Sequence, residues 1–146
     1  MNIYFACSIT GGRAYEAVYQ ALTAALLADG HIVPTAHLAD SGVLQLEGVV
    51  SPAEVYERDV TWIREADALI AEVSAPSHGV GYEVGYALQA GKKVLCLSRQ
   101  GVKVSKMITG NPDPNLQVRT YQEDQEAVSL VRAFIAELSP SPLAQD

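Results

Sequence analysis

Three glycines and a carboxylate gather at one predicted turn, in the run Ser-His-Gly-Val-Gly-Tyr-Glu-Val-Gly at residues 77–85. The run follows an apolar segment, 68–73, and the pattern places Glu83 in the first turn of a helix that ends near Gly91. Backbone amides at a helix start favour an anion, either a bound phosphate or the Glu83 carboxylate itself. Glycine inside a helix costs about 1 kcal/mol, so close approach of a ligand would account for the crowding. A carboxylate stabilised only by the helix dipole is the simpler alternative.

The spacing of these glycines disfavours a dinucleotide-binding fingerprint. Gly79, Gly81 and Gly85 follow the pattern Gly-x-Gly-x-x-x-Gly, whereas the fingerprint is Gly-x-Gly-x-x-Gly. They also follow the third predicted strand instead of the first, and Glu83 would repel a pyrophosphate placed beside it. The chemistry of this turn is therefore expected to centre on the carboxylate.

Asp59 is a second carboxylate, and its predicted position faces inward. In segment 52–66 the apolar residues recur at helical spacing and form one stripe: Val55, Trp62, Ile63 and Ala66. Asp59 falls inside this stripe, four residues before Ile63. An acid in that position is expected to be paired, to be protonated, or to line a cavity. A salt bridge to Arg58 or Arg64 is the alternative, although Arg58 is expected to face solvent.

Two carboxylates with separated pKa values are the usual means of breaking a glycosidic bond, because one attacks the anomeric carbon while the other protonates the leaving group. Tyr4, in the first predicted strand, is placed to hydrogen-bond Glu83; a half-buried strand tyrosine is the alternative. Ser8, Ser77 and Ser105 lie in predicted loops, where each by itself is an ordinary hydroxyl.

Strands and helices are predicted to alternate along the chain. The strands are expected at 2–8, 31–36, 67–73, 92–98 and 116–121, and the helices at 13–29, 52–66, 77–91 and 124–138. Ser51, Pro52 and Glu54 form a helix-start signal, and Asp124 is the expected cap of the last helix. Pro34 favours an edge position or the end of its strand. Segment 37–50 has no clear period and is expected to be a long binding loop.

This alternation predicts an α/β domain of the flavodoxin-like or Rossmann-like type. Helices cover both faces of a five-stranded parallel sheet in three layers. Ligands of such sheets bind outside the carboxyl ends of the strands. Four segments are expected to converge there: 8–12, His37, 74–81 and 98–107.

Length and charge exclude several functions. The 146 residues predict one domain over 1–138 with a frayed tail over 139–146. A formal charge of −7 disfavours a nucleic-acid surface, and no apolar run reaches the roughly 20 residues of a membrane span. No secretory signal is present at the N-terminus, and Cys7 and Cys96 are expected to be buried thiols of a cytoplasmic protein. We expect no metal and no cofactor.

Four stretches together resemble one known family. They are Ile-Tyr-Phe-Ala-Cys-Ser-Ile-Thr-Gly-Gly-Arg at 3–13, Glu-Arg-Asp-Val-Thr-Trp at 57–62, residues 71–85, and Lys-Val-Leu-Cys-Leu at 93–97. The chain resembles the 2′-deoxynucleoside 5′-phosphate N-hydrolases of the nucleoside 2-deoxyribosyltransferase superfamily, over about residues 2–138. The resemblance implies a flavodoxin-like sheet and a homodimer whose partner subunit completes the site. It also implies a covalent deoxyribosyl intermediate on a glutamate, formed without a cofactor.

The resemblance also implies roles for individual residues. Glu83 matches the nucleophile, Asp59 the general acid at the base, and Tyr4 the tyrosine that orients the nucleophile. Residues matching the contacts to sugar, phosphate and base are Ser8, Ile9, Gly11, Gly12, His37, Ser77 and Gly79. Ser105, with Met107 beside it, matches a serine that reaches the phosphate from the partner subunit.

Thr10 departs from the family pattern, because the animal hydrolases carry arginine there. Thr10 keeps a hydroxyl but loses charge-assisted hydrogen bonds to the phosphate. Two outcomes are open: weaker affinity for the phosphate, or substitution by Arg13.

Three other activities compete with hydrolysis of a deoxynucleoside 5′-monophosphate. In a deoxyribosyltransferase a second base, not water, attacks the intermediate, but classical transferases tend to carry an acid where Ser77 stands. A ribonucleotide hydrolase and a nucleotide-binding module without turnover are the other two.

Overall fold

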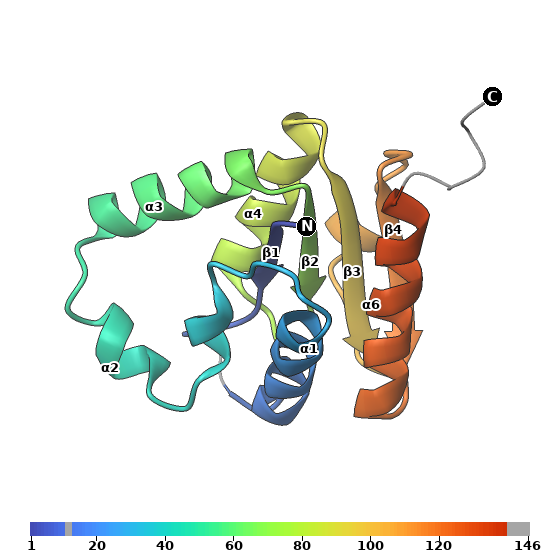
Figure 1. The fold of residues 1–146 in the computed structure, drawn as a ribbon, viewed down its shortest axis with the longest axis horizontal. Coiled ribbons are helices and arrows are strands. Elements are labelled where there is room, and N and C mark those ends of the chain that lie inside the picture. The colour runs from blue at the N-terminus through green and yellow to red at the C-terminus, as the bar shows by residue number, and fades with distance from the viewer. Residues whose placement is uncertain (11–12, 140–146) are drawn as a thin grey trace.

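The computed structural model describes residues 1–10 and 13–139 (Figure 1). Within these residues, four parallel strands form one sheet in the order β1 (Ile3–Ala6), β2 (Ala68–Glu72), β3 (Lys93–Arg99), β4 (Leu116–Tyr121). The longer helices are α1 (Glu16–Ala28), α3 (Pro52–Glu65), α4 (His78–Gln89) and α6 (Asp124–Leu138). Shorter helical segments are η1 (Ala36–Ala39), α2 (Val43–Glu47) and α5 (Lys106–Thr109).

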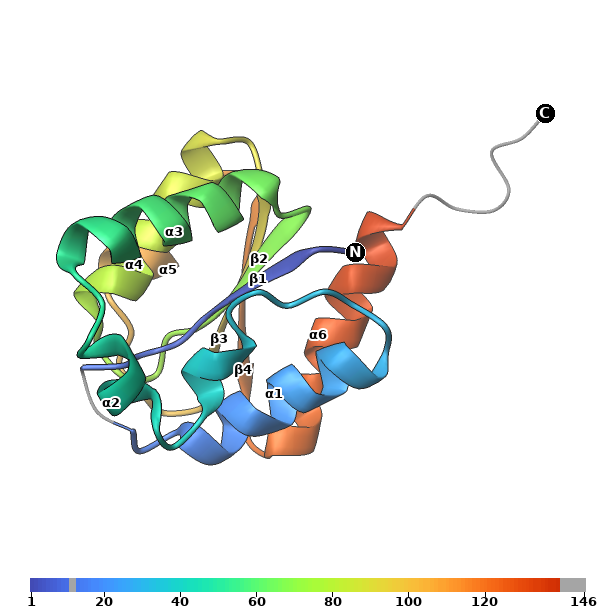
Figure 2. The ribbon, with the colours of Figure 1, turned by 60° about the vertical axis from the view of Figure 1, so that its left-hand side comes forward.

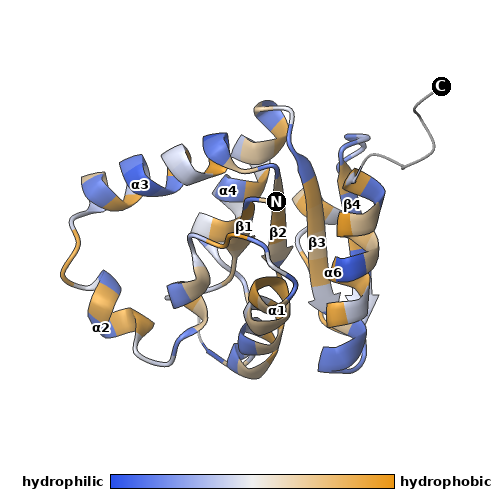
Figure 3. Ribbon diagram, in the orientation of Figure 1, coloured by the Kyte–Doolittle hydropathy of each residue, from blue (hydrophilic) through white to orange (hydrophobic). Residues whose placement is uncertain are grey.

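Helices cover both faces of the sheet, as Figures 1 and 2 show together. α1 and α6 pack on one face, where Phe5 and Leu22 belong to one apolar cluster. α3 and α4 pack on the other, where Tyr4 and Val84 belong to a second cluster. Figure 3 shows hydrophobic residues concentrated on the strands and hydrophilic residues over much of α3. The predicted α/β architecture with a parallel sheet is confirmed.

The prediction of five strands was wrong, because segment 31–36 contributes one isolated bridge, between Asn2 and Ile32. The amide of Ile3 donates to Ile32 O at 2.8 Å, but Pro34, two residues later, has no amide to continue the ladder. The next amide of β1 on this edge, that of Phe5, donates instead to the Thr35 hydroxyl at 3.0 Å. A side chain thus replaces the missing strand before the chain turns into η1.

The helix-start signals were correct in one case and displaced in another. Ser51 and Glu54 form a reciprocal capping box on α3, with Pro52 as its first residue. At α6, Asp124 is the first helical residue and not the cap, which is Glu123. The Asp124 carboxylate accepts from Arg99 at 2.9 Å instead, so it ties α6 to the end of β3.

The cysteines, the C-terminal tail, membrane helices and metal clusters can each be compared with the described residues. Cys7 and Cys96 are free and buried, as predicted. The predicted tail lies outside the described residues except for Ser139. Across residues 1–10 and 13–139, no helix has the length and apolarity to cross a membrane. The same residues contain no cluster of His, Cys, Asp and Glu suited to a metal ion.

Replacement of Thr35 by valine tests how the edge of β1 is completed. Thr35→Val removes the acceptor of a buried amide, and we expect a loss of about 1–3 kcal/mol in unfolding free energy, measured by urea denaturation. Thr23→Val is the matched control, because the buried Thr23 hydroxyl bonds only to carbonyls of its own helix. Equal losses in the two variants would contradict this account of the edge.

Candidate active site

Glu83 lies in the second turn of α4 and not in the first. Ser77 is the N-cap of this helix, and its hydroxyl accepts from the Val80 amide at 3.2 Å. The helix begins at His78, so Glu83 is its sixth residue. Because the helix dipole acts mainly within the first turn, the dipole does not account for this carboxylate.

The Glu83 carboxylate is buried, and its Oε2 atom has no hydrogen-bond partner. Burial, and after it the charge of Asp59, raise the pKa of Glu83 to about 8, against the opposing effects of Tyr4 and Arg58. Removal from water penalises the ionised carboxylate, and a like charge nearby adds to that penalty. An unpaired buried acid with a pKa near neutrality is a candidate catalytic group.

Asp59 shares a pocket with Glu83. The pocket has a volume of about 390 Å³ and is otherwise lined mainly by apolar and aromatic residues: Val50, Pro52, Val55, Tyr56, Val60, Ile63, Gly79 and Tyr82. Asp59 meets both expectations, that of an acid lining a cavity and that of a salt bridge: it lines this pocket and accepts a hydrogen bond from Arg58 Nε at 2.8 Å. Burial raises the pKa of Asp59, and the hydrogen bond and charge of Arg58 lower it. Two acids with raised pKa values therefore line one pocket.

Tyr4 reaches the same carboxylates from β1. Its side chain is fully buried on the α3 and α4 face of the sheet, and its hydroxyl has no partner within ordinary hydrogen-bond geometry. The hydroxyl is nevertheless close enough to lower the pKa of Glu83, and burial together with the Glu83 charge raises the pKa of Tyr4. Catalytic hydrogen bonds are often long before substrate binds. Tyr4 is therefore placed to donate to Glu83 and not to ionise.

The loop after β1 is partly described. Ser8 is fully buried with an unpartnered hydroxyl, Ile9 packs against the α1 side of the core, and Thr10 is exposed. Gly11 and Gly12 lie outside the described residues.

Arg13 serves the structure of this loop. Its guanidinium donates to the carbonyls of Ser8, Leu38 and Asp40 and pairs with Glu16 at 3.2 Å. These bonds fasten the first loop to segment 38–40. They turn the guanidinium away from the role of a substitute phosphate ligand.

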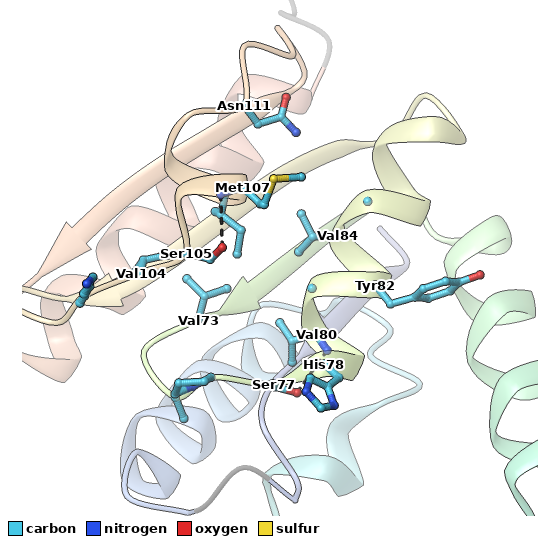
Figure 4. A pocket seen from close by; sticks show the side chains of 16 residues that line it. Val73, Ser77, His78, Val80, Tyr82, Val84, Val104, Ser105, Met107 and Asn111 are labelled. Atoms are coloured by element: carbon cyan, nitrogen blue, oxygen red, sulfur yellow. Dashed lines mark hydrogen bonds between the residues drawn. The ribbon is translucent and has the colours of Figure 1, made fainter.

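Ser77, Ser105 and Met107 line a neighbouring groove and not the pocket of the two acids. The groove has a volume of about 490 Å³ and runs between α4 and the segment that carries α5 (Figure 4). Ser105 is the N-cap of α5, and its hydroxyl accepts from the Met107 amide at 3.2 Å. Met107 is 83% exposed. Tyr82 lines both cavities and so marks where they meet.

The glycines of α4 have no structural explanation within the chain. Gly79, Gly81 and Gly85 do not have positive φ values, and side chains there would meet at most ordinary van der Waals contact. Their small size leaves the surface of α4 open to approach from outside.

Sequence reasoning named Arg58 only as an alternative partner of Asp59, and it missed Glu47. Arg58 was expected in solvent, but its side chain is only 24% exposed and lies over the Trp62 ring at 5.0 Å. Glu47, at the end of α2, pairs with both Arg58 and His37. The adjacency of Arg58 and Asp59 was a signal for the first residue, whereas the aperiodic segment 37–50 gave none for the second.

Comparison with known proteins identifies relatives along most of the chain. The family model described as nucleoside 2-deoxyribosyltransferase matches residues 3–117. A Mus musculus protein named 5-hydroxymethyl-dUMP N-hydrolase is 39% identical over 142 residues, which cover 94% of this chain and 82% of the relative. A Thermofilum pendens protein with the provisional name 2′-deoxynucleoside 5′-phosphate N-hydrolase 1 is 42% identical over 137 residues, covering 92% and 95%.

Two solved structures share the fold at low sequence identity. A Clostridium botulinum CMP N-glycosidase superposes with a TM-score of 0.69 at 21% identity, covering 90% of this chain and 98% of that one. The molybdenum cofactor carrier protein of Chlamydomonas reinhardtii superposes with a TM-score of 0.60 at 17% identity, covering 92% and 97%. Because proteins with such different names share one fold, function must be argued from the site.

The pKa of Glu83 provides a test of the paired site. Asp59→Asn removes a neighbouring negative charge, so we expect the pKa of Glu83 to fall from about 8 by about one pH unit. Carboxyl ¹³C NMR titration measures it, with Glu83→Gln identifying the resonance. Glu57→Gln, which removes an exposed acid from the same helix, is the control and is expected to leave the titration unchanged. An unchanged Glu83 titration in Asp59→Asn would show that the two acids do not interact.

Proposed function

This chain belongs to the nucleoside 2-deoxyribosyltransferase family, and we propose that it hydrolyses the N-glycosidic bond of 2′-deoxynucleoside 5′-monophosphates. The products would be a free nucleobase and 2-deoxyribose 5-phosphate. Relatives that span most of the chain carry names for this class of reaction. The observation that carries the proposal is the pair of partly buried acids, Glu83 and Asp59, that line one pocket.

The proposed mechanism gives the two acids different roles. Ionised Glu83 attacks C1′ while protonated Asp59 gives its proton to the departing base, which leaves a deoxyribosyl ester on Glu83. Water then attacks C1′ of the ester, loses a proton to Asp59, and releases the Glu83 carboxylate. The missing 2′-hydroxyl of a deoxy substrate eases the oxocarbenium-like transition state. Tyr4 would hold the attacking carboxylate in place.

The phosphate would lie at the start of α4. Ser77 and Gly79 stand at the N-terminus of this helix, where backbone amides and the dipole favour an anion. The buried, unpartnered hydroxyl of Ser8 supports a polar contact to the substrate from the first loop. Ile9 and Thr10 continue that loop, and the loss of an arginine at Thr10 would leave the phosphate held mainly by amides and hydroxyls.

The active form would be a homodimer in which Ser105 crosses to the partner's phosphate. Three features support this: the exposure of Met107, the apolar groove beside it, and the open surface of α4 at Gly81 and Gly85. Ser105 and Ser77 line opposite sides of that groove within one chain (Figure 4). A second copy seated there would bring its own Ser105 toward this chain's Ser77.

A panel of nucleosides and nucleotides tests the reaction itself. We expect free base from deoxynucleoside 5′-monophosphates, measured by chromatography, and a loss of at least about 1,000-fold in Glu83→Ala because the nucleophile is gone. Glu57→Ala is the control and should retain activity. Base release by Glu83→Ala at the wild-type rate would rule out the mechanism.

The same panel separates the competing activities. Exchange with an added second base would identify a transferase, faster release from CMP than from dCMP would identify a ribonucleotide hydrolase, and binding without release would identify a binding module.

Mixing two inactive variants tests the shared site. Ser105→Asp keeps a good helix cap but places a negative charge against the phosphate, so we expect it to be inactive, like Glu83→Ala. In a mixed dimer, one site would combine an intact Glu83 with an intact Ser105. Equal mixing should restore about a quarter of wild-type activity, since half the dimers are mixed and each has one intact site. No recovery after verified subunit exchange would place Ser105 and Glu83 in the same subunit's site.

A further inference from the structure

The guanidinium of Arg58 lies between two carboxylates. Its Nε donates to Asp59 Oδ1 at 2.8 Å, and its terminal nitrogen lies 3.1 Å from Glu47 Oε1. The exposed fractions of Arg58, Glu47 and Asp59 are 24%, 12% and 15%, so solvent screens these contacts only partly. The ring of Trp62 lies under the guanidinium and limits its movement.

Glu47 is itself held in place by His37. Nε2 of His37 lies 2.9 Å from Glu47 Oε1, and the His37 ring packs edge-on against Trp62 at 6.1 Å. The Glu47 carboxylate of α2 thus connects His37 of η1 with Arg58 of α3. The groups acting on Asp59 are then Arg58 from α3, Glu47 from α2, His37 from η1, and Glu83 from α4 with Tyr4 from β1.

Arg58 creates a difficulty for the proposed reaction. The acid that protonates the leaving base must hold a proton, but a hydrogen-bonded cation favours its ionised form. A second carboxylate on the same guanidinium offsets part of that effect. Glu47 occupies this position.

We propose that Glu47 is a positioning residue for Asp59, acting through the Arg58 guanidinium that the two carboxylates share. The proposal rests on the proposed hydrolase function, in which Asp59 is the general acid. Arg58 orients the Asp59 carboxyl toward the pocket. The negative charge of Glu47 offsets part of the Arg58 charge, so that Arg58 favours the ionised form of Asp59 less strongly. Because Glu47 is the last residue of α2, the position of that short helix influences the pKa of Asp59.

The charge effects have the required directions. Burial raises the pKa of Asp59, Arg58 lowers it, the Glu47 charge raises it, and His37 has a smaller lowering effect. Loss of the Glu47 charge would therefore lower the pKa of Asp59.

A lower Asp59 pKa has a distinct kinetic signature. Glu83 and Asp59 share one proton in the active form, with Glu83 ionised and Asp59 protonated, and the other placement of that proton is inactive. A lower Asp59 pKa moves the acid limb of kcat/KM to lower pH and reduces the plateau by the same factor. The rate far below the acid limb stays unchanged, because all that it requires is one proton lost from Glu83. A merely structural defect would instead lower the whole profile.

The experiment is a pH profile of kcat/KM for dCMP hydrolysis in Glu47→Gln, which keeps size and removes charge. We expect the acid limb to move down by about one pH unit and the plateau to fall about tenfold. The same substitution in an Arg58→Gln background is expected to lose most of this effect, since the guanidinium transmits it. Glu57→Gln, an exposed acid on α3, is the matched control and should leave the profile unchanged.

Three results would overturn the proposal while leaving the hydrolase function intact: an unmoved acid limb, a uniform fall at all pH values, or an equal shift with and without Arg58. If wild-type protein released no base, the proposed function would fail instead. Carboxyl ¹³C NMR titration of Asp59 in Glu47→Gln gives a reading that does not depend on activity. A pKa of Asp59 that does not fall there would also overturn the proposal.

Discussion

The constraint on which this site depends is that two partly buried carboxylates in one pocket cannot both be ionised at low cost. Burial and the charge of Asp59 together raise the pKa of Glu83 to about 8, so the pair is expected to share a proton near neutral pH. A shared proton is useful for glycosidic cleavage, which needs one ionised and one protonated acid. The surrounding fold can be understood as the means of desolvating this pair: α3 supplies Asp59, α4 supplies Glu83, and β1 supplies Tyr4 between them.

The site consists of two neighbouring cavities, the pocket of the two acids and the groove that Ser77 and Ser105 line. The two acids line one pocket of a single chain, among mainly apolar and aromatic side chains, and Asp59 is paired with Arg58 of the same chain. The groove that holds Ser77 and Ser105 is bordered by exposed groups such as Met107. Gly81 and Gly85 of α4 also line it, and no contact within the chain requires glycine at either position. Under the proposed function, the chemistry would be assembled within one chain, and the phosphate would be recognised at a surface that a second copy completes.

Sequence patterns predicted most of the fold because the signals were local. The capping box at Ser51 and the inward position of Asp59 depend on spacing within one helix, and both were found in the structure. The missing strand depended on competition between Pro34, which lacks an amide, and Thr35, which offers a hydroxyl to β1. The contact of Glu47 with Arg58 joins residues from two helices across an aperiodic segment, so no periodicity could predict it. Glu83 was predicted in the first turn of α4 but lies in the second. The difference matters because the helix dipole acts mainly on the first turn.

The central claim is that Glu83 attacks the sugar and carries it as an ester. Acid quenching during steady turnover of a deoxynucleoside 5′-monophosphate, followed by proteolysis and mass spectrometry, tests it directly. The account predicts that the peptide containing Glu83 gains the mass of a deoxyribosyl 5-phosphate group, and that the Glu83→Ala protein shows no such adduct. Rapid turnover with no adduct on Glu83, or an adduct on Asp59, would contradict it.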